Sequence, residues 1–178
     1  MDLIKKRTIE NEILPFLSPA IKQIMQRMNS GFWPQLEEIR LRNGQPLLLK
    51  VGEKYYGLER EGALSEKLCR CYVVGEEDIY RSLASISDNS LYAFEEEIKR
   101  GFITIPGGHR VGLSGQVILA GSEVRTMKDF SGVAFRMARE VEGCSQSLLP
   151  YIYSADAQPL STLIISAPGC GKTTLLRD

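Results

Sequence analysis

Residues 166–174 constrain the fold of this chain more than any other segment. They read Ser-Ala-Pro-Gly-Cys-Gly-Lys-Thr-Thr and follow residues 160–165, a predicted buried strand that ends in Leu-Ile-Ile. A buried strand, a glycine-rich turn and Gly-Lys-Thr at the start of a helix are typical of a phosphate-binding loop. Backbone N–H groups curl around the anion there, and the lysine reaches the terminal phosphates. The pattern predicts the start of a RecA-like α/β domain, against the alternative of a plain turn before a helix.

The predicted ligand of this loop is ATP with Mg²⁺. We expect Lys172 to reach the terminal phosphates and the hydroxyl of Thr173 to bind Mg²⁺. Ser166 departs from the usual pattern, which has glycine at that position. The predicted nucleotide-binding residues are Ser166, Gly169, Cys170, Gly171, Lys172, Thr173 and Thr174.

Only residues 175–178 follow the double threonine, and they include no acidic strand end of the kind that holds Mg²⁺ through water. We therefore expect no catalytic residue in residues 1–178 and no ATP hydrolysis by them alone. The full-length protein is expected to be a P-loop ATPase, of which this chain is the N-terminal portion.

The residues ahead of the loop predict an α+β domain with N-terminal helices and an antiparallel β-rich region. Apolar spacing of three and four predicts helices, alternation predicts strands, and glycine turns join neighbouring strands. The expected domains are 1–154, an α+β assembly domain, and 155–178, the start of the P-loop domain. Helices are predicted over 4–14, 18–30, 74–87, 90–100 and 145–153, and strands over 36–42, 46–51, 102–105, 109–113, 116–119, 123–127, 133–137 and 160–165.

Composition narrows the function classes. The 22 basic and 22 acidic side chains cancel, which argues against direct nucleic-acid binding. No apolar run is long enough to span a bilayer, and the N-terminus lacks an apolar signal-peptide core. We expect a cytoplasmic protein that reaches the membrane through partners. Cys69 and Cys71 with the single His109 do not make a zinc pattern, so we expect free thiols.

The chain resembles the stage III sporulation protein AA family of spore-forming bacteria. The resemblance covers nearly the whole chain, and its most specific block is Gly-Gly-His-Arg-Val-Gly-Leu-Ser-Gly-Gln at residues 107–116. Serine at position 166 is normal in this family. The other matching blocks are residues 37–42, 45–47, 101–104, 135–140 and the phosphate loop.

This family is similar to the type II and type IV secretion ATPases, which are hexameric rings with a variable N-terminal domain and a RecA-like motor. The resemblance implies an ATPase that powers a channel between mother cell and forespore. It also implies a homo-oligomeric ring when the protein is full length, and membrane-embedded sporulation channel proteins as partners. By the same resemblance, Arg110, Arg136 and Arg139 are candidates to contact nucleotide phosphates, the alternative being surface or structural ion pairs.

Three alternatives stay open from the sequence. The residues before the loop can be a non-enzymatic module for ring assembly and docking to a membrane partner. A nucleic-acid-associated P-loop protein is a weaker alternative. His109 is interpreted as a structural turn residue, with a phosphate sensor as the other reading.

Overall fold

The computed structural model describes residues 11–88, 90, 94–138, 143–154, 156, 158–167 and 170–178, without the side chains of residues 173 and 177. The chain divides into two compact units, Met1–Met137 and Ala138–Asp178. Each unit is described by itself. The predicted domains, 1–154 and 155–178, stay predictions.

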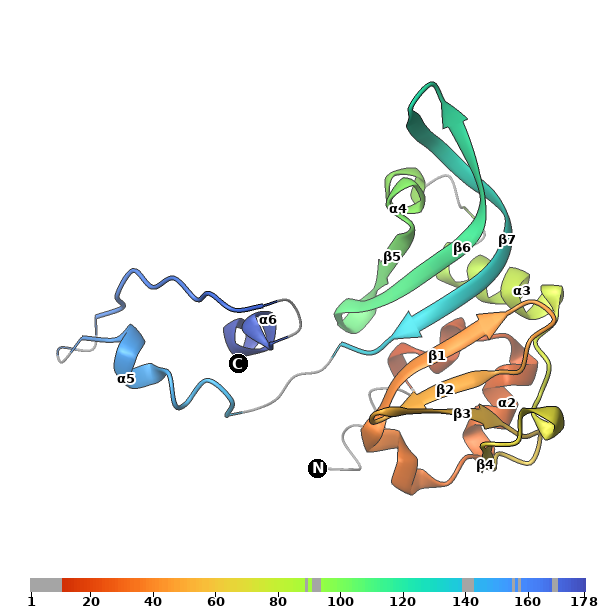
Figure 1. The fold of residues 1–178 in the computed structure, drawn as a ribbon, viewed down its shortest axis with the longest axis horizontal. Helices are drawn as coiled ribbons and strands as arrows, with labels where there is room; N and C mark the ends of the chain where they lie inside the picture. Colours follow the sequence, from red (N-terminus) through yellow and green to blue (C-terminus); the bar gives the residue numbers. More distant parts are fainter. Residues whose placement is uncertain are drawn as a thin grey trace. The chain divides into compact units, whose positions relative to one another are not determined.

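One antiparallel sheet organises the first unit. Among the described residues it has seven strands in the order β4-β3-β2-β1-β7-β6-β5 (Figure 1). The α+β class with an antiparallel sheet, predicted from the sequence, is confirmed. The strands are β1 Leu36–Arg42, β2 Leu48–Val51, β3 Lys54–Leu58, β4 Leu64–Ser65, β5 Phe102–Ile105, β6 His109–Ala120 and β7 Glu123–Arg136.

The pairing of β1 with β7 joins the meander β1–β4 to the later group β5–β7. Ile39 lies opposite Phe135, and both side chains are fully buried. Because side chains alternate along a strand, Arg40 and Arg42 lie on the opposite face from Ile39 and Leu41. The sheet therefore has one apolar face and one face that carries arginines.

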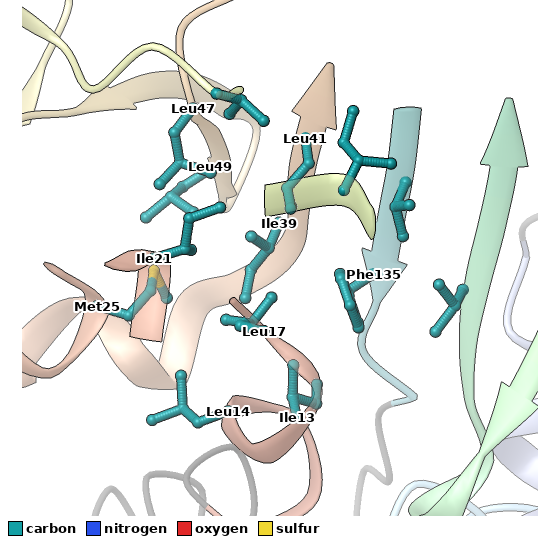
Figure 2. Close-up of a cluster of buried hydrophobic side chains, with 14 of the residues drawn as sticks. Ile13, Leu14, Leu17, Ile21, Met25, Ile39, Leu41, Leu47, Leu49 and Phe135 are labelled. Atoms are coloured by element: carbon teal, nitrogen blue, oxygen red, sulfur yellow. The ribbon is translucent and has the colours of Figure 1, made fainter. Parts of the chain in front are cut away.

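Helices cover the apolar face. They are α2 Pro19–Arg27, α3 Glu76–Ile86 and α4 Glu95–Arg100, with the 3-10 turn η1 Leu14–Phe16. The hydroxyl of Ser18 accepts a hydrogen bond from the N–H of Ile21, which caps α2 at the start of the helix predicted over residues 18–30. Figure 2 shows Ile21 and Met25 of α2 against Ile39 of β1 in the buried cluster.

Two sequence predictions are corrected in the hairpin. Residues 109–113 and 116–119 are one strand, β6, and residues 123–127 and 133–137 fall mostly in one strand, β7. Gly115 does not end β6. Because it has no side chain, it lets the backbone of β7 come close at this point. A Cβ added there would lie 2.8 Å from the carbonyl oxygen of Lys128. Residues 4–10 of the helix predicted over 4–14, and residues 91–93 of the helix predicted over 90–100, lie outside the described residues.

The second unit contains α5 Leu149–Ile152 and α6 Lys172–Arg177. The prediction of a buried strand over residues 160–165 is wrong. This segment forms no strand, and the side chains of Leu163 and Ile165 are each 82% exposed. The described residues of this unit include no strand with which residues 160–165 could pair. The apolar side chains of this segment therefore stay in solvent. None of the described helices is long and apolar enough to cross a membrane.

Candidate phosphate-binding sites

The predicted phosphate loop is organised around Lys172, the first residue of α6. Its ammonium group donates to the carbonyl oxygen of Ser166 at 2.6 Å and to that of Ala167 at 2.9 Å. The Ser166 hydroxyl lies 3.1 Å from the same Nζ. Oxygens of Ser166 and Ala167 therefore hold the charge of the lysine, and a phosphate can replace them as the acceptor.

The turn into α6 depends on Gly171. Its φ of 82° lies in the left-handed region, which glycine enters without steric strain. Cys170 is exposed beside it, and Thr174 is half-buried. Gly169 and the side chain of Thr173 lie outside the described part of the chain, so the Mg²⁺ prediction at Thr173 stays a prediction.

A contact that the sequence does not predict holds α6 in the second unit. The carboxylate of Asp178 accepts hydrogen bonds from the backbone N–H groups of Gly143 and Ser145, both at 2.8 Å, and from the Ser145 hydroxyl at 2.7 Å. The backbone and side chain of Ser145, followed by the N–H of Gly143, lower the pKa of Asp178. No local pattern indicates this contact, because more than thirty positions separate the partners.

The predicted phosphate-contacting arginines lie in the first unit. Arg110 of β6 and Arg136 of β7 are directly paired across the two strands, so the structure brings them together. Arg139 lies outside the described residues. Both described arginines are exposed on the face of the sheet opposite the core.

Arg110 and Arg136 line a hollow of about 330 Å³ together with Arg40 and Arg42, two arginines of β1 that were not predicted from the sequence as site residues. The signal was present in the sequence, since Arg40 and Arg42 alternate with apolar residues and so share one face. Nothing in the sequence showed that this face meets Arg110 and Arg136. We call this feature the arginine hollow. Its other lining residues are Leu41, Gly101, Phe102, Gly112, Leu113, Ser114, Val133 and Ala134.

Glu38 fixes two of the four arginines. Its buried carboxylate lies 2.6 Å from Arg40 and 3.1 Å from Arg136. Partial burial lowers the pKa of Arg40, but the hydrogen bond and charge of Glu38 outweigh burial and raise it overall. Arg40 also donates to the hydroxyl of Tyr55 at 2.7 Å, and its guanidinium lies 4.6 Å from the centre of that ring.

His109 occupies a buried position at the start of β6. Its Nε2 lies 2.8 Å from Oε2 of Glu12, and the side chain is only 3% exposed. A ring that is closed off from solvent and already holds a carboxylate supports the structural reading over a phosphate sensor. The described cysteines are free thiols, and the described residues include no cluster of three potential metal ligands.

Comparison with known proteins identifies the family. The model of the family "Sporulation stage III, protein AA" matches residues 6–178. The chain is 38% identical over 169 residues to stage III sporulation protein AA of Bacillus subtilis (strain 168). That match covers 94% of this chain and 50% of the relative, so the chain spans half the relative's length. No solved structure matches the chain. The chain therefore belongs to the sporulation stage III protein AA family.

Proposed function

We infer that this chain is the N-terminal part of an ATP-binding, ATP-hydrolysing motor of the secretion-ATPase type that acts in sporulation. Family membership supports the role in sporulation. The proposed motor forms a homo-oligomeric ring and powers a channel between mother cell and forespore with membrane-embedded partner proteins. The resemblance to secretion ATPases supports this finer reading.

The observation that carries the proposal is the position of Lys172. Three oxygens of Ser166 and Ala167, all within 3.1 Å, hold its ammonium group. A lysine that is already oriented towards the loop loses little side-chain freedom when a phosphate arrives. ATP with Mg²⁺ fits this donor set, with Lys172 on the terminal phosphates and Thr173 proposed for Mg²⁺.

Titration calorimetry with a non-hydrolysable ATP analogue and Mg²⁺ tests this site. Lys172→Ala is expected to weaken binding about tenfold or more, because it removes charge-assisted hydrogen bonds to phosphate. Lys128→Ala, an exposed lysine of β7 in the other unit, is the matched control and leaves affinity unchanged. Equal affinity in wild type and Lys172→Ala would overturn the proposal.

Hydrolysis is proposed for the longer protein and not for residues 1–178. Release of inorganic phosphate is expected to stay at background for this chain, because the nucleotide-binding residues predicted from the sequence include none that would orient the attacking water. A chain as long as the relative is expected to hydrolyse ATP with Mg²⁺. Robust Mg²⁺-dependent turnover by residues 1–178 would contradict the proposal that hydrolysis needs the longer protein.

We also propose that Arg110, Arg136 and Arg139 contact nucleotide phosphates in the assembled motor. A guanidinium presents a rigid fork of donors that suits phosphate oxygens better than the point charge of a lysine. Replacing Arg136 and Arg139 by glutamine in the longer protein tests this role. Unchanged ATP affinity and turnover would remove these residues from the proposal.

A second candidate function is a non-enzymatic module for ring assembly and docking. The observation in its favour is the outer part of the β6–β7 hairpin, which extends beyond β5 and β1 (Figure 1). Val117, Leu119 and Val124 are exposed there. Light scattering after size exclusion separates the candidates, since an assembly module forms oligomers without nucleotide and keeps them in Lys172→Ala.

A further inference from the structure

We propose that the arginine hollow binds a ligand with two or more linked phosphate groups, and that this site is complete within the first unit. The site does not depend on nucleotide binding at the phosphate loop. All the residues that line it come from four neighbouring strands and the glycine before β5.

The charge of the hollow selects an anion with several negative charges. Arg40, Arg42, Arg110 and Arg136 line it, and no acidic side chain does. The buried carboxylate of Glu38 neutralises one of these guanidinium groups, which leaves a net charge of three positive. A single carboxylate or phosphate does not balance this charge, whereas a diphosphate carries enough negative charge and enough oxygens for several guanidinium forks.

The shape of the hollow suits a compact ligand. Its floor is made of small residues where the strands pair, since Gly112 of β6 lies opposite Ala134 of β7. Larger side chains at these positions would fill the space between the arginines. A volume of about 330 Å³ is at the lower end of the range for small-molecule sites.

The arginines are held in place before any ligand binds. Glu38 holds Arg40 and Arg136, as described above. The guanidinium of Arg110 lies 5.0 Å from the centre of the Phe102 ring, within the range of a cation–π contact. Prior orientation reduces the entropy lost when the side chains bind an anion. No described acidic side chain pairs with Arg42 or Arg110, so their donors are available to a ligand.

The test uses inorganic pyrophosphate and titration calorimetry on the chain that carries Lys172→Ala, which removes the contribution of the loop. This chain is expected to bind pyrophosphate. Adding Arg42→Gln and Arg110→Gln is expected to weaken binding about 10- to 100-fold, from the loss of charge-assisted hydrogen bonds. Both arginines are exposed, so the variant is expected to keep its fold.

Two further variants separate a site from general charge. Arg81→Gln with Arg125→Gln removes two exposed arginines elsewhere in the same unit and is expected to leave pyrophosphate affinity unchanged. Ala134→Leu keeps every charge but fills the floor of the hollow. It is expected to weaken pyrophosphate binding about tenfold or more, because the ligand loses hydrogen bonds to the arginines. Circular dichroism and urea unfolding verify that each variant is folded.

The outcomes are distinct. Absence of pyrophosphate binding by the Lys172→Ala chain would overturn the proposal, and so would an equal loss in the Arg81/Arg125 control. A titration of the wild-type chain with ATP then tests whether the site is separate from the phosphate loop. One ATP per chain that requires both Lys172 and Arg110 would overturn a site that is complete within the first unit, and two independent binding events would support it. The proposal for the phosphate loop fails in a different experiment, in which Lys172→Ala binds the ATP analogue as tightly as wild type does.

Discussion

The carboxylate of Glu38 and the guanidinium of Arg136 lie 3.1 Å apart across the β1–β7 pairing, although 98 positions separate them in the chain. The two residues are also register partners in the sheet. This ion pair therefore lies where the β1–β4 meander meets the β5–β7 group, and beside the arginine hollow. It links the assembly of the sheet to the geometry of the candidate anion site.

Replacing Glu38 by glutamine is expected to lower the free energy of unfolding by about 1–2 kcal/mol. The change removes a buried charge that holds Arg40 and Arg136. The loss is limited because the guanidinium of Arg136, whose side chain is 67% exposed, can form hydrogen bonds with water instead. Urea unfolding measures the difference. Glu77→Gln is the matched control, because its pair with Arg81 is exposed and is expected to contribute less than about 0.5 kcal/mol. Equal losses in the two variants would show that burial does not strengthen the Glu38 pairs.

The sequence predicted the local elements of the first unit well, because their signals lie within a few residues. Ser18 before Pro19 marks the start of α2, and Gly101 ends α4 with a φ of 80°. Alternation from residue 38 to residue 42 identifies β1. Each of these signals is a property of neighbouring side chains and does not require the rest of the fold.

The features that the sequence did not predict depend on distant partners. The pairing of β1 with β7 places Arg136 opposite Glu38, which also binds Arg40, and no periodicity encodes that arrangement. The run over residues 160–165 has the composition of a buried parallel strand, but such a strand exists only where others pair with it. Composition alone therefore gave a wrong strand there and missed half of the arginine hollow.

Replacing Asp78 by alanine is expected to lower the free energy of unfolding by about 3 kcal/mol. This buried carboxylate accepts hydrogen bonds from the hydroxyl groups of Ser18 and Tyr72 and from the N–H of Gly75. It joins the start of α2, the segment before α3 and the first turn of α3, so three donors lose their acceptor at once. Thermal and urea unfolding measure the loss. Glu76→Ala, in the same turn but exposed, is expected to change stability little, and an equal loss there would contradict the network.

Alanine at position 107 is expected to cost more stability than alanine at position 121. Both glycines have positive φ values, 81° and 67°, so both substitutions carry backbone strain of about 1 kcal/mol. A Cβ on Gly107 would also lie 2.7 Å from Nε2 of His109 and still closer to the carboxylate of Glu12, whereas nothing lies within 4 Å of one on Gly121. We expect Gly107→Ala to cost about 1–3 kcal/mol more in urea unfolding. Equal costs would mean that the His109–Glu12 contact moves aside freely.

The stability of the first unit is expected to fall at alkaline pH through Tyr72. Burial, then the hydrogen bond and charge of Asp78, raise the pKa of Tyr72 from 10.0 to about 12. A group whose pKa is raised on folding contributes stability that is complete below its unfolded pKa and is lost as the pH rises through its folded pKa. The Tyr72 contribution should therefore be present below pH 10 and disappear as the pH approaches about 12.

Urea unfolding at several pH values across this window, in wild type and Tyr72→Phe, isolates the effect. The variant lacks the hydroxyl, so it is less stable below pH 10 and should lose less stability as the pH rises. Tyr80→Phe is the matched control, because Tyr80 is 69% exposed on α3 and its loss should leave the wild-type slope intact. Parallel pH profiles for wild type, Tyr72→Phe and Tyr80→Phe would refute the assignment. A flatter pH profile of stability in Tyr72→Phe alone would show that alkaline unfolding depends on the Tyr72 hydroxyl, which donates a hydrogen bond to Asp78.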